Sequence, residues 1–358
     1  RMSRPRSVFL RVLGVSAAVI AAGVGVASCA LSAPRHRGPP SDHFRDGRFF
    51  NLDGAQERSF GETAKWILNR DVGPWHEQPD APPGPPPARR VELGQLRVTF
   101  VNHATVLIQV DGLNILTDPI WSERASPVSW AGPKRVRPPG IRFEDLPPID
   151  AVLLSHNHYD HMDLPTLRRL VKAFPRVRIF AGLGNRQFLE AKGLYTATDL
   201  DWWHEARLSK NVDLVSVPVQ HFSARGLTDR NGTLWTGYVI RGPAGVTYFA
   251  GDTGYGSHFR KVGERYGPVR LAVLPIGAYK PEWFMSPVHV SPAEAVKAHR
   301  ELGAFRSVAV HFGTFALADD GQEEPVVALR ESLQAARVPE ENFWVLGFGE
   351  GRDVPPQR

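Results

Sequence analysis

Four residues that can bind metal ions occur within six positions of a single short segment. His156, His158, Asp160 and His161 form the pattern His-x-His-x-Asp-His directly after the apolar run Ala151–Leu154. At this spacing the first two histidines can direct their imidazoles to one ion, while the aspartate and the third histidine reach a second. The segment therefore predicts a metal centre with histidine and carboxylate ligands.

Three further residues of the same kind follow other apolar runs. The runs that end at residues 220, 251 and 310 lead directly into His221, Asp252 and His311. Together with the first four, these residues can hold two metal ions that share one carboxylate. Nitrogen and oxygen ligands without sulfur favour Zn²⁺, with Fe or Mn as alternatives. We therefore predict a site with two Zn²⁺ ions.

These candidate ligands depend on strands and helices that the pattern of apolar residues predicts. Short β-branched runs predict strands at Leu96–Val101, Thr105–Val110, Leu113–Leu116, Ala151–Leu154, Val177–Phe180, Leu214–Val219, Thr236–Ile240, Val246–Ala250, Leu271–Pro275, Ser307–Val310 and Phe343–Leu346. Between them, helices are predicted at Leu164–Phe174, Asn185–Lys192, His258–Tyr266, Pro292–Leu302 and Glu324–Ala336. Strand-rich halves with interspersed helices indicate an α/β fold with two sheets and outer helices.

Composition and charge narrow the class of protein. The chain has 358 residues, of which 42% are hydrophobic and 22% charged. This composition is globular and excludes a collagen-like chain, a coiled coil or disorder over the whole length. The net charge is +6, but four arginines lie in the first eleven residues, and without them it is +2. Charge therefore gives little support for a nucleic-acid partner, and we expect none.

The first residues resemble a targeting segment, which predicts a signal peptide over residues 1–28. A basic stretch to Arg11 precedes sixteen small or apolar residues, Val12–Ala27, fewer than the roughly 20 that span a membrane. The ending at Val26–Cys29 resembles a bacterial lipobox, and Cys29, the only cysteine, would be the lipidated residue. We expect a membrane-anchored lipoprotein of the bacterial cell envelope that faces the periplasm. The alternatives are an uncleaved anchor helix and a cytoplasmic enzyme whose start is misassigned.

Three further regions follow this leader. Residues 29–47 are polar and predict a mobile linker, and residues 48–90 predict an arm with a short helix near Glu62–Asn69. The arm ends in a spacer with six prolines among the nine residues of Pro79–Pro87, a composition typical of extended polyproline structure. Residues 91–358 are expected to form the main domain, which contains the candidate metal ligands.

The ligand pattern resembles the binuclear zinc site of the metallo-β-lactamase superfamily. Other segments resemble, more closely, the N-acyl-phosphatidylethanolamine phospholipase D family within it. They are Asn102–Thr105, Leu116–Pro119, Arg124–Pro127, Gly132–Arg135, Leu146–Ala151, Leu200–Trp203, Phe249–Tyr255, Pro275–Tyr279 and Gly313–Ala318. The resemblance extends from about residue 94 to 350 and implies an αβ/βα sandwich with the metals at one edge.

The resemblance also implies a role for each candidate residue. His156, His158 and His221 would bind the first zinc, Asp160, His161 and His311 the second, and Asp252 would bridge them. His103 and Asp118 would orient the ligands from behind, although capping of strand ends is the alternative role for both. Asn102 stands where the family is expected to have glycine.

The implied reaction is hydrolysis of a phosphodiester by a metal-activated water, whose proton Asp160 or Asp252 would accept. The implied substrate is N-acyl-phosphatidylethanolamine, and the products are N-acylethanolamine and phosphatidic acid. Tyr159 and His289 are expected on the substrate side, although Tyr159 could equally be a packing residue. Trp202, Trp203, Trp283 and Phe284 are expected in the core, with an acyl groove or insertion into a membrane as the alternatives. The expected partners are the phospholipid substrate, a membrane surface and, by resemblance, a second copy in a homodimer.

Two other functions fit parts of the sequence. A metallo-hydrolase of the same fold could act on another phosphodiester or on a lactone, because the ligand pattern does not separate these substrates. A non-catalytic lipid-binding lipoprotein of the envelope is the alternative from another class. All seven ligands are present, which favours an enzyme.

Overall fold

A computed structural model describes residues 31–55 and 57–357 of the chain. The predicted signal peptide, residues 1–28, and Cys29 lie outside the described residues. Among the helices that are described, none has the length and apolar character needed to cross a membrane.

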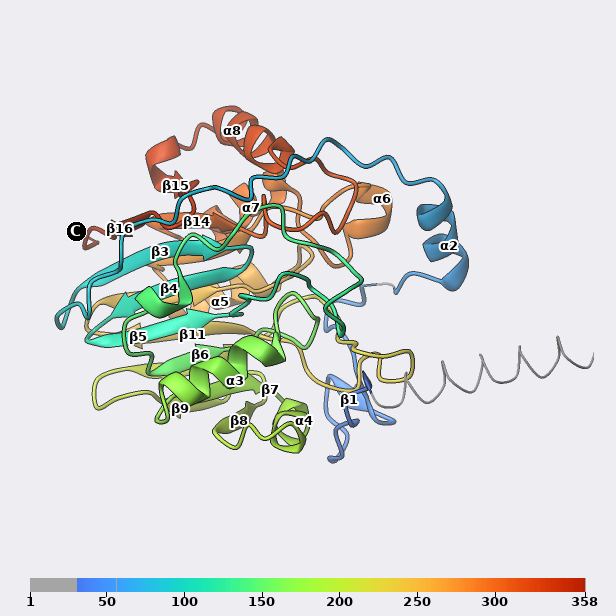
Figure 1. Cartoon of the computed structure of the whole chain (residues 1–358), viewed down its shortest axis with the longest axis horizontal. Coiled ribbons are helices and arrows are strands. Elements are labelled where there is room, and N and C mark those ends of the chain that lie inside the picture. Colours follow the sequence, from blue (N-terminus) through green and yellow to red (C-terminus); the bar gives the residue numbers. More distant parts are fainter. Residues whose placement is uncertain (1–30, 56, 358) are drawn as a thin grey trace, which may run out of the picture.

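Two seven-stranded sheets form the body of the protein (Figure 1). The first has the order β16-β3-β4-β5-β6-β7-β8 and the second the order β15-β14-β13-β12-β11-β10-β9. The first sheet contains β3 (Leu96–Asn102), β4 (Thr105–Val110), β5 (Leu113–Thr117), β6 (Ala151–Leu153), β7 (Arg178–Gly182), β8 (Ala197–Leu200) and β16 (Gly351–Asp353). The second contains β9 (Glu205–Arg207), β10 (Asp213–Val217), β11 (Gly237–Gly242), β12 (Gly245–Phe249), β13 (Leu271–Pro275), β14 (Arg306–Val310) and β15 (Phe343–Trp344).

Helices cover the outer face of each sheet. Those on the first sheet are α3 (Leu164–Ala173) and α4 (Asn185–Ala191), and those on the second are α5 (His258–Tyr266), α7 (Pro292–Glu301) and α8 (Glu324–Ala336). The remaining described helices are α2 (Phe60–Leu68), α6 (Glu282–Met285), and the short 3₁₀ helices η1 (Phe143–Asp145) and η2 (Glu340–Asn342). The fold is the predicted α/β sandwich of two mixed sheets flanked by helices.

The alternation of side chains along β6 explains why this sheet is covered on both faces. Ala151 and Leu153 lie in the core between the sheets, while Val152 and Leu154 lie in the outer core with α3. Because successive side chains point to opposite faces, a strand that is apolar at every position must be covered on both sides. The continuous apolar run that predicted this strand therefore also required the helix layer.

Most predicted elements match the structure closely. The bounds of β4, β13, α5 and α8 agree with the prediction at both ends. Strands β8, β9 and β16 and helix α6 were not predicted. Two of them, β9 (Glu205–Arg207) and β16 (Gly351–Asp353), lie at sheet edges with no buried residue, and such strands carry no apolar alternation to detect.

The prediction of a mobile linker is wrong for the part of residues 29–47 that the structure describes. Strands β1 (Phe44–Arg45) and β2 (Arg48–Phe49) pair with each other. Phe44 and Phe49 are buried beside Trp202 and Trp235. The backbone N–H of Ala33 donates to Asp229 at 2.7 Å. The polar composition indicated a tether, but Phe44 within the segment and Phe49 just after it are buried and hold the segment on the body.

The arm continues over the same end of the molecule (Figure 1). Its helix α2 begins with a capping box in which Ser59 and Glu62 bond to each other's backbone N–H groups, close to where a short helix was predicted. We keep the name arm for residues 48–90.

Candidate metal centre

The candidate ligands meet because their strands end at one edge of the sandwich. In the first sheet, β3, β5 and β6 run in the same direction and are followed by His103, Asp118 and the loop 154–161. In the second, β10, β12 and β14 share a direction and are followed by His221, Asp252 and His311. The carboxyl ends of parallel strands meet at one edge, which is the usual location of α/β active sites.

Close contacts at the strand ends join the two sheets. The backbone N–H of His311 donates to the carbonyl of His103 at 2.7 Å. Gly251 has φ +63°, and a Cβ on it would lie 2.3 Å from the Cβ of Ser155. Only glycine allows this approach without a shift. The loop of Asp252 can therefore lie directly against the loop that begins the histidine motif.

Three imidazoles converge on the first side of the centre. Nε2 of His156 lies 2.8 Å from Nδ1 of His158, and Nε2 of His221 lies 3.4 Å from the same Nδ1. His156 and His221 are buried, and His158 is half-buried. Their ring nitrogens are close enough together to bind one ion. They are the three residues predicted for the first metal.

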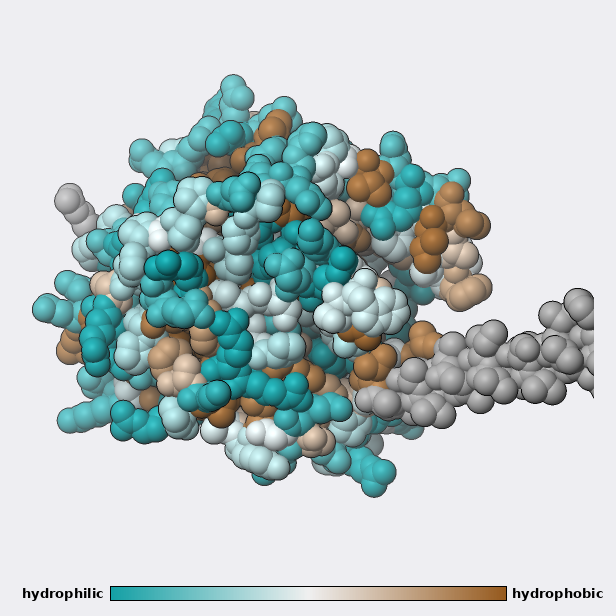
Figure 2. All heavy atoms as spheres, in the orientation of Figure 1, coloured by the Kyte–Doolittle hydropathy of each residue, from teal (hydrophilic) through white to brown (hydrophobic). Residues whose placement is uncertain are grey.

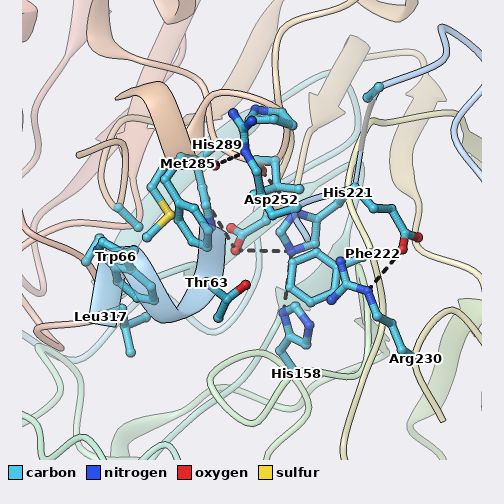
Figure 3. Close-up of a pocket in the computed structure, with 18 of the residues that line it drawn as sticks. Thr63, Trp66, His158, His221, Phe222, Arg230, Asp252, Met285, His289 and Leu317 are labelled. Carbon is cyan, nitrogen blue, oxygen red and sulfur yellow. Dashed lines mark hydrogen bonds and ion pairs between the residues drawn. The ribbon is translucent and has the colours of Figure 1, made fainter. Parts of the chain in front are cut away.

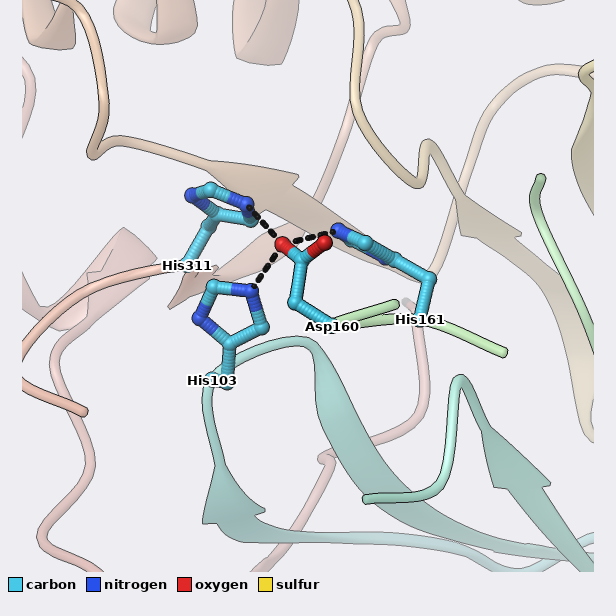
Figure 4. A group of neighbouring side chains, drawn as sticks. All are labelled: His103, Asp160, His161 and His311. Atoms are coloured by element: carbon cyan, nitrogen blue, oxygen red, sulfur yellow. Dashed lines mark hydrogen bonds and ion pairs between the residues drawn. The ribbon is translucent and has the colours of Figure 1, made fainter. Parts of the chain in front are cut away.

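The second side of the centre is built around one carboxylate oxygen (Figure 4). Oδ2 of Asp160 lies 2.8 Å from Nε2 of His103, 3.1 Å from Nε2 of His161 and 3.7 Å from Nε2 of His311. His103 was expected only as a supporting residue. It is buried within this group, where its ring holds Asp160 in place.

Asp252 lies between the two groups. Its Oδ2 is 3.1 Å from Nε2 of His161, 3.1 Å from Nε2 of His311 and 3.9 Å from Nε2 of His221. A single carboxylate oxygen therefore reaches histidines of both predicted metal sites. This is the position that the predicted bridging role requires.

A buried carboxylate supports the ligands from behind. Asp118 is fully buried and accepts hydrogen bonds from the backbone N–H and the hydroxyl of Ser155 at 2.7 and 2.6 Å. Its Oδ2 also lies 2.6 Å from Nδ1 of His161, and the Ser155 hydroxyl lies 2.9 Å from Nδ1 of His156. Asp118 thus fixes ring orientation on both sides, which is how outer carboxylates tune metal sites.

The pKa values of the histidines divide the centre into neutral and charged parts. Burial, together with neighbouring histidines, lowers the pKa of His158 to about 3 and those of His156 and His221 well below their usual range. These imidazoles are neutral and have a lone pair to offer. Burial opposes charge on His311 and His161 as well, but Asp252 and Asp160 outweigh it. The pKa of His311 rises to about 9, and that of His161 rises well above its usual range.

The residues fit a divalent metal ion by two observations. Among the described residues, the buried atoms Nε2 of His161, Nε2 of His311 and Oδ1 of Asp252 have no directed hydrogen-bond partner, whereas buried polar atoms normally have one. The low pKa values of Asp160 and Asp252 arise from positive charge beside them, despite their burial. Imidazole nitrogens and carboxylate oxygens around a centre that favours cations are a donor set for divalent metals.

A cavity of about 500 Å³ opens onto the metal centre. Five of the candidate metal ligands face it, namely His158, Asp160, His221, Asp252 and His311. Most of the remaining wall is apolar and includes Phe60, Trp66, Phe222, Phe284, Met285 and Leu317. Figure 3 shows α2 of the arm lying across this cavity, with Thr63 and Trp66 directed into it. The cavity thus joins a polar, metal-binding end to an apolar wall.

Two predicted substrate-side residues differ in their placement. His289 lines the cavity, and its Nδ1 lies 3.9 Å from Oδ2 of Asp252. The Tyr159 hydroxyl instead donates to the carbonyl of Arg225 at 2.9 Å, and the Arg225 guanidinium lies over the tyrosine ring. Tyr159 is absent from the cavity wall, so its placement is that of the alternative, a packing residue.

The aromatic residues that were expected in the core or near the substrate also differ in their placement. Trp202 is buried, with its indole N–H on the carbonyl of Trp235. Phe284 lines the cavity, whereas Trp283 is 44% exposed.

One residue of the arm contacts the centre and was missed by the sequence analysis. Asn51 donates to the carbonyl of His221 at 2.9 Å and accepts from the backbone N–H of His221 at 3.0 Å. Its Oδ1 also accepts from the indole N–H of Trp235 at 3.0 Å. The aromatic residues of the arm indicated packing, but no local pattern indicated a polar bond to a ligand 170 residues away.

Comparison with known proteins identifies the family. The family model described as "Beta-lactamase superfamily domain" matches residues 113–312. An N-acyl-phosphatidylethanolamine-hydrolyzing phospholipase D of Caenorhabditis elegans is 38% identical over 266 residues, which cover 71% of this chain and 75% of the relative. An uncharacterized protein of Mycobacterium tuberculosis is 37% identical over 328 residues, which cover 89% and 85%.

Solved structures share the fold at lower identity. An isothiocyanate hydrolase from Delia radicum gut bacteria has a TM-score of 0.56 at 21% identity, over 72% of this chain and 98% of the other. Igni18, a metallo hydrolase of Ignicoccus hospitalis, has a TM-score of 0.55 at 22% identity, over 74% and 100%.

The fold and the cluster of histidines and aspartates define a metal-dependent hydrolase. The chain belongs to the metallo-β-lactamase superfamily, in the family that includes the phospholipases D that hydrolyse N-acyl-phosphatidylethanolamine.

Proposed function

We propose that the protein is a phosphodiesterase of the phospholipase D type that uses two Zn²⁺ ions. Its substrate in this proposal is N-acyl-phosphatidylethanolamine, and its products are N-acylethanolamine and phosphatidic acid. The nematode relative, 38% identical over most of its length, is named for this substrate.

The observation that carries the proposal is the two-sided character of the cavity. One end presents the histidines and aspartates of the metal centre, and the wall beyond them presents Phe60, Trp66, Met285 and Leu317. A phospholipid has the same division, with a charged phosphodiester and apolar chains. Burying the chains against this wall would place the phosphodiester at the centre.

Bound at these ligands, the two ions would polarise the phosphoryl group and lower the pKa of a water molecule toward neutrality. The protein's own groups then have defined tasks. Asp160 and Asp252 line the cavity as ionised carboxylates, because neighbouring histidines hold their pKa values low. In this proposal they hold the ions, and one of them takes up the proton of a water whose own pKa the ions have lowered. His103 donates to Asp160 and fixes its direction. Burial lowers the pKa of His289 to about 4, so its neutral ring can donate to a phosphoryl oxygen.

The full chain should therefore release N-acylethanolamine and phosphatidic acid from N-acyl-phosphatidylethanolamine, detected by mass spectrometry. We expect a chelator and the substitution His158→Ala to abolish release, and His76→Ala, at an exposed histidine, to leave it unchanged. Phosphatidylcholine is the comparison lipid. A protein that binds metal but releases nothing from the N-acylated lipid would contradict this substrate, and other phosphodiesters and lactones would be assayed next.

We further propose that the chain is anchored at the cell envelope through Cys29. This proposal rests on the order of basic and apolar residues before Cys29 and on its being the only cysteine. Mass analysis of the mature amino terminus tests it. A diacylglyceryl group on Cys29 is the expected result, and an unprocessed amino terminus would contradict it.

A further inference from the structure

Helix α2 presents its apolar side to solvent rather than to the core. Phe60, Ala64, Ile67 and Leu68 follow the spacing i, i+4, i+7, i+8 that places side chains on one face of a helix. Phe60 is 90% exposed, Ile67 59% and Leu68 83%. No residue of this helix is buried. An apolar stripe of this kind normally packs against a partner.

The opposite side of α2 holds it on the body. Trp66 stacks on Phe284 with ring centroids 4.8 Å apart, and its indole N–H donates to Asp319. Arg58 donates to the carbonyl of Phe284 at 2.9 Å, and Arg70 pairs with Asp319 at 2.7 Å. The helix is therefore fixed in a defined orientation, with its apolar stripe outward.

The exposed apolar side chains gather in this region. Among the described residues, eleven large hydrophobic side chains are exposed, and five of them lie on or beside α2 and α6: Phe60, Ile67, Leu68, Val72 and Trp283. Figure 2 shows the hydrophobic residues of α2 together at the right-hand end of the molecule. Nζ of Lys65 lies 5.1 Å from the centroid of the Trp283 ring. Tryptophan and lysine at the margin of an apolar face are typical of helices in a membrane interface.

The apolar stripe of α2 is continuous with the mouth of the cavity. This position limits which kind of partner can cover the stripe. Phe60 lines the cavity and is almost fully exposed, so it stands at the entrance. A protein seated on the stripe would obstruct that entrance, whereas a lipid layer would cover the stripe and supply the substrate. The described chain begins at residue 31, and β1 (Phe44–Arg45), which follows shortly after, lies at the same end of the molecule as α2 (Figure 1). The proposed anchor at Cys29 would therefore tether the protein from this side.

We propose that the outer face of α2, with Trp283 beside it, docks the protein on a phospholipid surface and presents the cavity mouth to the lipids. The choice of a lipid surface as the occupant rests on the proposed function. In this arrangement an N-acylated phospholipid moves from the bilayer past Phe60 without crossing water.

The first test measures amide hydrogen exchange of the full chain with and without vesicles of phosphatidylcholine and phosphatidylglycerol that contain no substrate. We expect slower exchange over residues 60–72 in the presence of vesicles, and no change over α8. Unchanged exchange at 60–72 would overturn the proposal. So would the same protection produced without vesicles by raising the protein concentration, because it would identify a second copy as the occupant.

The second test compares the variant I67S/L68S with the control L93S/V327S, which changes two exposed apolar residues, at 60% and 50% exposure, away from the cavity wall. On substrate in vesicles we expect the α2 variant to lose roughly tenfold in turnover, and the control to lose nothing. On a short-chain monomeric substrate both should match the unmodified protein. An equal loss on both substrates, or no loss on vesicles, would overturn the docking proposal.

These two tests separate docking from the proposed reaction. Failure of the unmodified protein to hydrolyse either form of the substrate contradicts the function, while hydrogen exchange still decides the docking surface.

Discussion

Two regions form the walls of the cavity, and they are built in opposite ways. The loops after the strands bury polar and charged groups, several of which are held by further hydrogen bonds, as Asp118 is by Ser155 and His161. The arm contributes α2, which buries none of its residues and exposes its apolar stripe. The loops thus gather buried groups that can do chemistry, whereas the arm exposes an apolar surface to solvent.

The difference shows where rigidity is needed. The positions of metal ligands must be fixed within a fraction of an ångström, and dense packing at the strand ends provides this. In the proposed function, the acyl chains of the substrate need only an apolar surface of adequate width, so a helix attached by a few bonds is sufficient as their wall. The two regions meet directly at Asn51, which bonds to the backbone of His221.

The largest expected effect comes from the carboxylate between the two halves of the metal centre. Asp252→Ala removes the oxygen that reaches His161, His311 and His221, and turnover should fall by about a thousandfold or more. Metal content, measured by mass spectrometry, should fall with it. The matched change Asp353→Ala, at an exposed ion pair with Arg97, should alter neither. A variant of Asp252 that keeps its metal and its activity would show that this carboxylate does not bridge the centre.

A smaller effect is expected from a substitution of Asp118, which supports the candidate ligands from behind. Asp118→Asn keeps the volume but cannot accept all the hydrogen bonds from Ser155 and His161. The affinity for Zn²⁺ should fall by about 10- to 100-fold, measured by competition with a metal indicator. If the affinity is unchanged while the melting temperature falls, Asp118 acts on the fold alone.

Removal of the hydrogen bonds between the arm and the metal centre should have a smaller effect than the Asp118 substitution. Asn51→Ala leaves the backbone N–H and carbonyl of His221 without their side-chain partner and removes one of the two acceptors of the Trp235 indole N–H, since the Val219 carbonyl remains. The free energy of unfolding should fall by about 1–3 kcal/mol. Because His221 is a ligand in the proposed site, the affinity for Zn²⁺ should fall by roughly tenfold or less. Asn69→Ala, whose amide bonds only within α2 at Lys65, is the control. An unchanged affinity in the Asn51 variant would mean that the arm packs on the centre without positioning it.

The smallest expected effect is a change of the melting temperature with pH, which arises from His43 in the segment that precedes the arm. Burial opposes charge on His43, but hydrogen bonds to Asp201 and Asp42 outweigh it and raise its pKa. A raised pKa gives stability that is fully present below the unfolded value, about 6.5, and is lost as pH rises through the folded value. The melting temperature should therefore fall slightly between about pH 6 and about pH 8. His43→Gln should remove this dependence, and a variant that retains it would assign the titration to another group.

Elements of the fold could be predicted from sequence where the burial of a strand is visible in its own residues. Strand β6 is apolar at every position because it is covered on both faces, and the segment after it carries its ligands at fixed spacing. The same reasoning succeeded for the strands before His221, Asp252 and His311. It did not find the edge strands β9 and β16, which have no buried residue, and it assigned the described part of residues 29–47 to a mobile linker.

What the sequence determined by itself is the chemistry of the centre. Residue types and spacing after apolar runs identify the histidines and aspartates, because a strand end and the loop that follows it are neighbours in the chain. Only the tertiary structure decided that Asn51 bonds to His221, that the Tyr159 hydroxyl turns to Arg225, and that α2 exposes its apolar stripe. These features join residues that are far apart in sequence, and their contacts are fixed by how the sheets, the loops and the arm pack together.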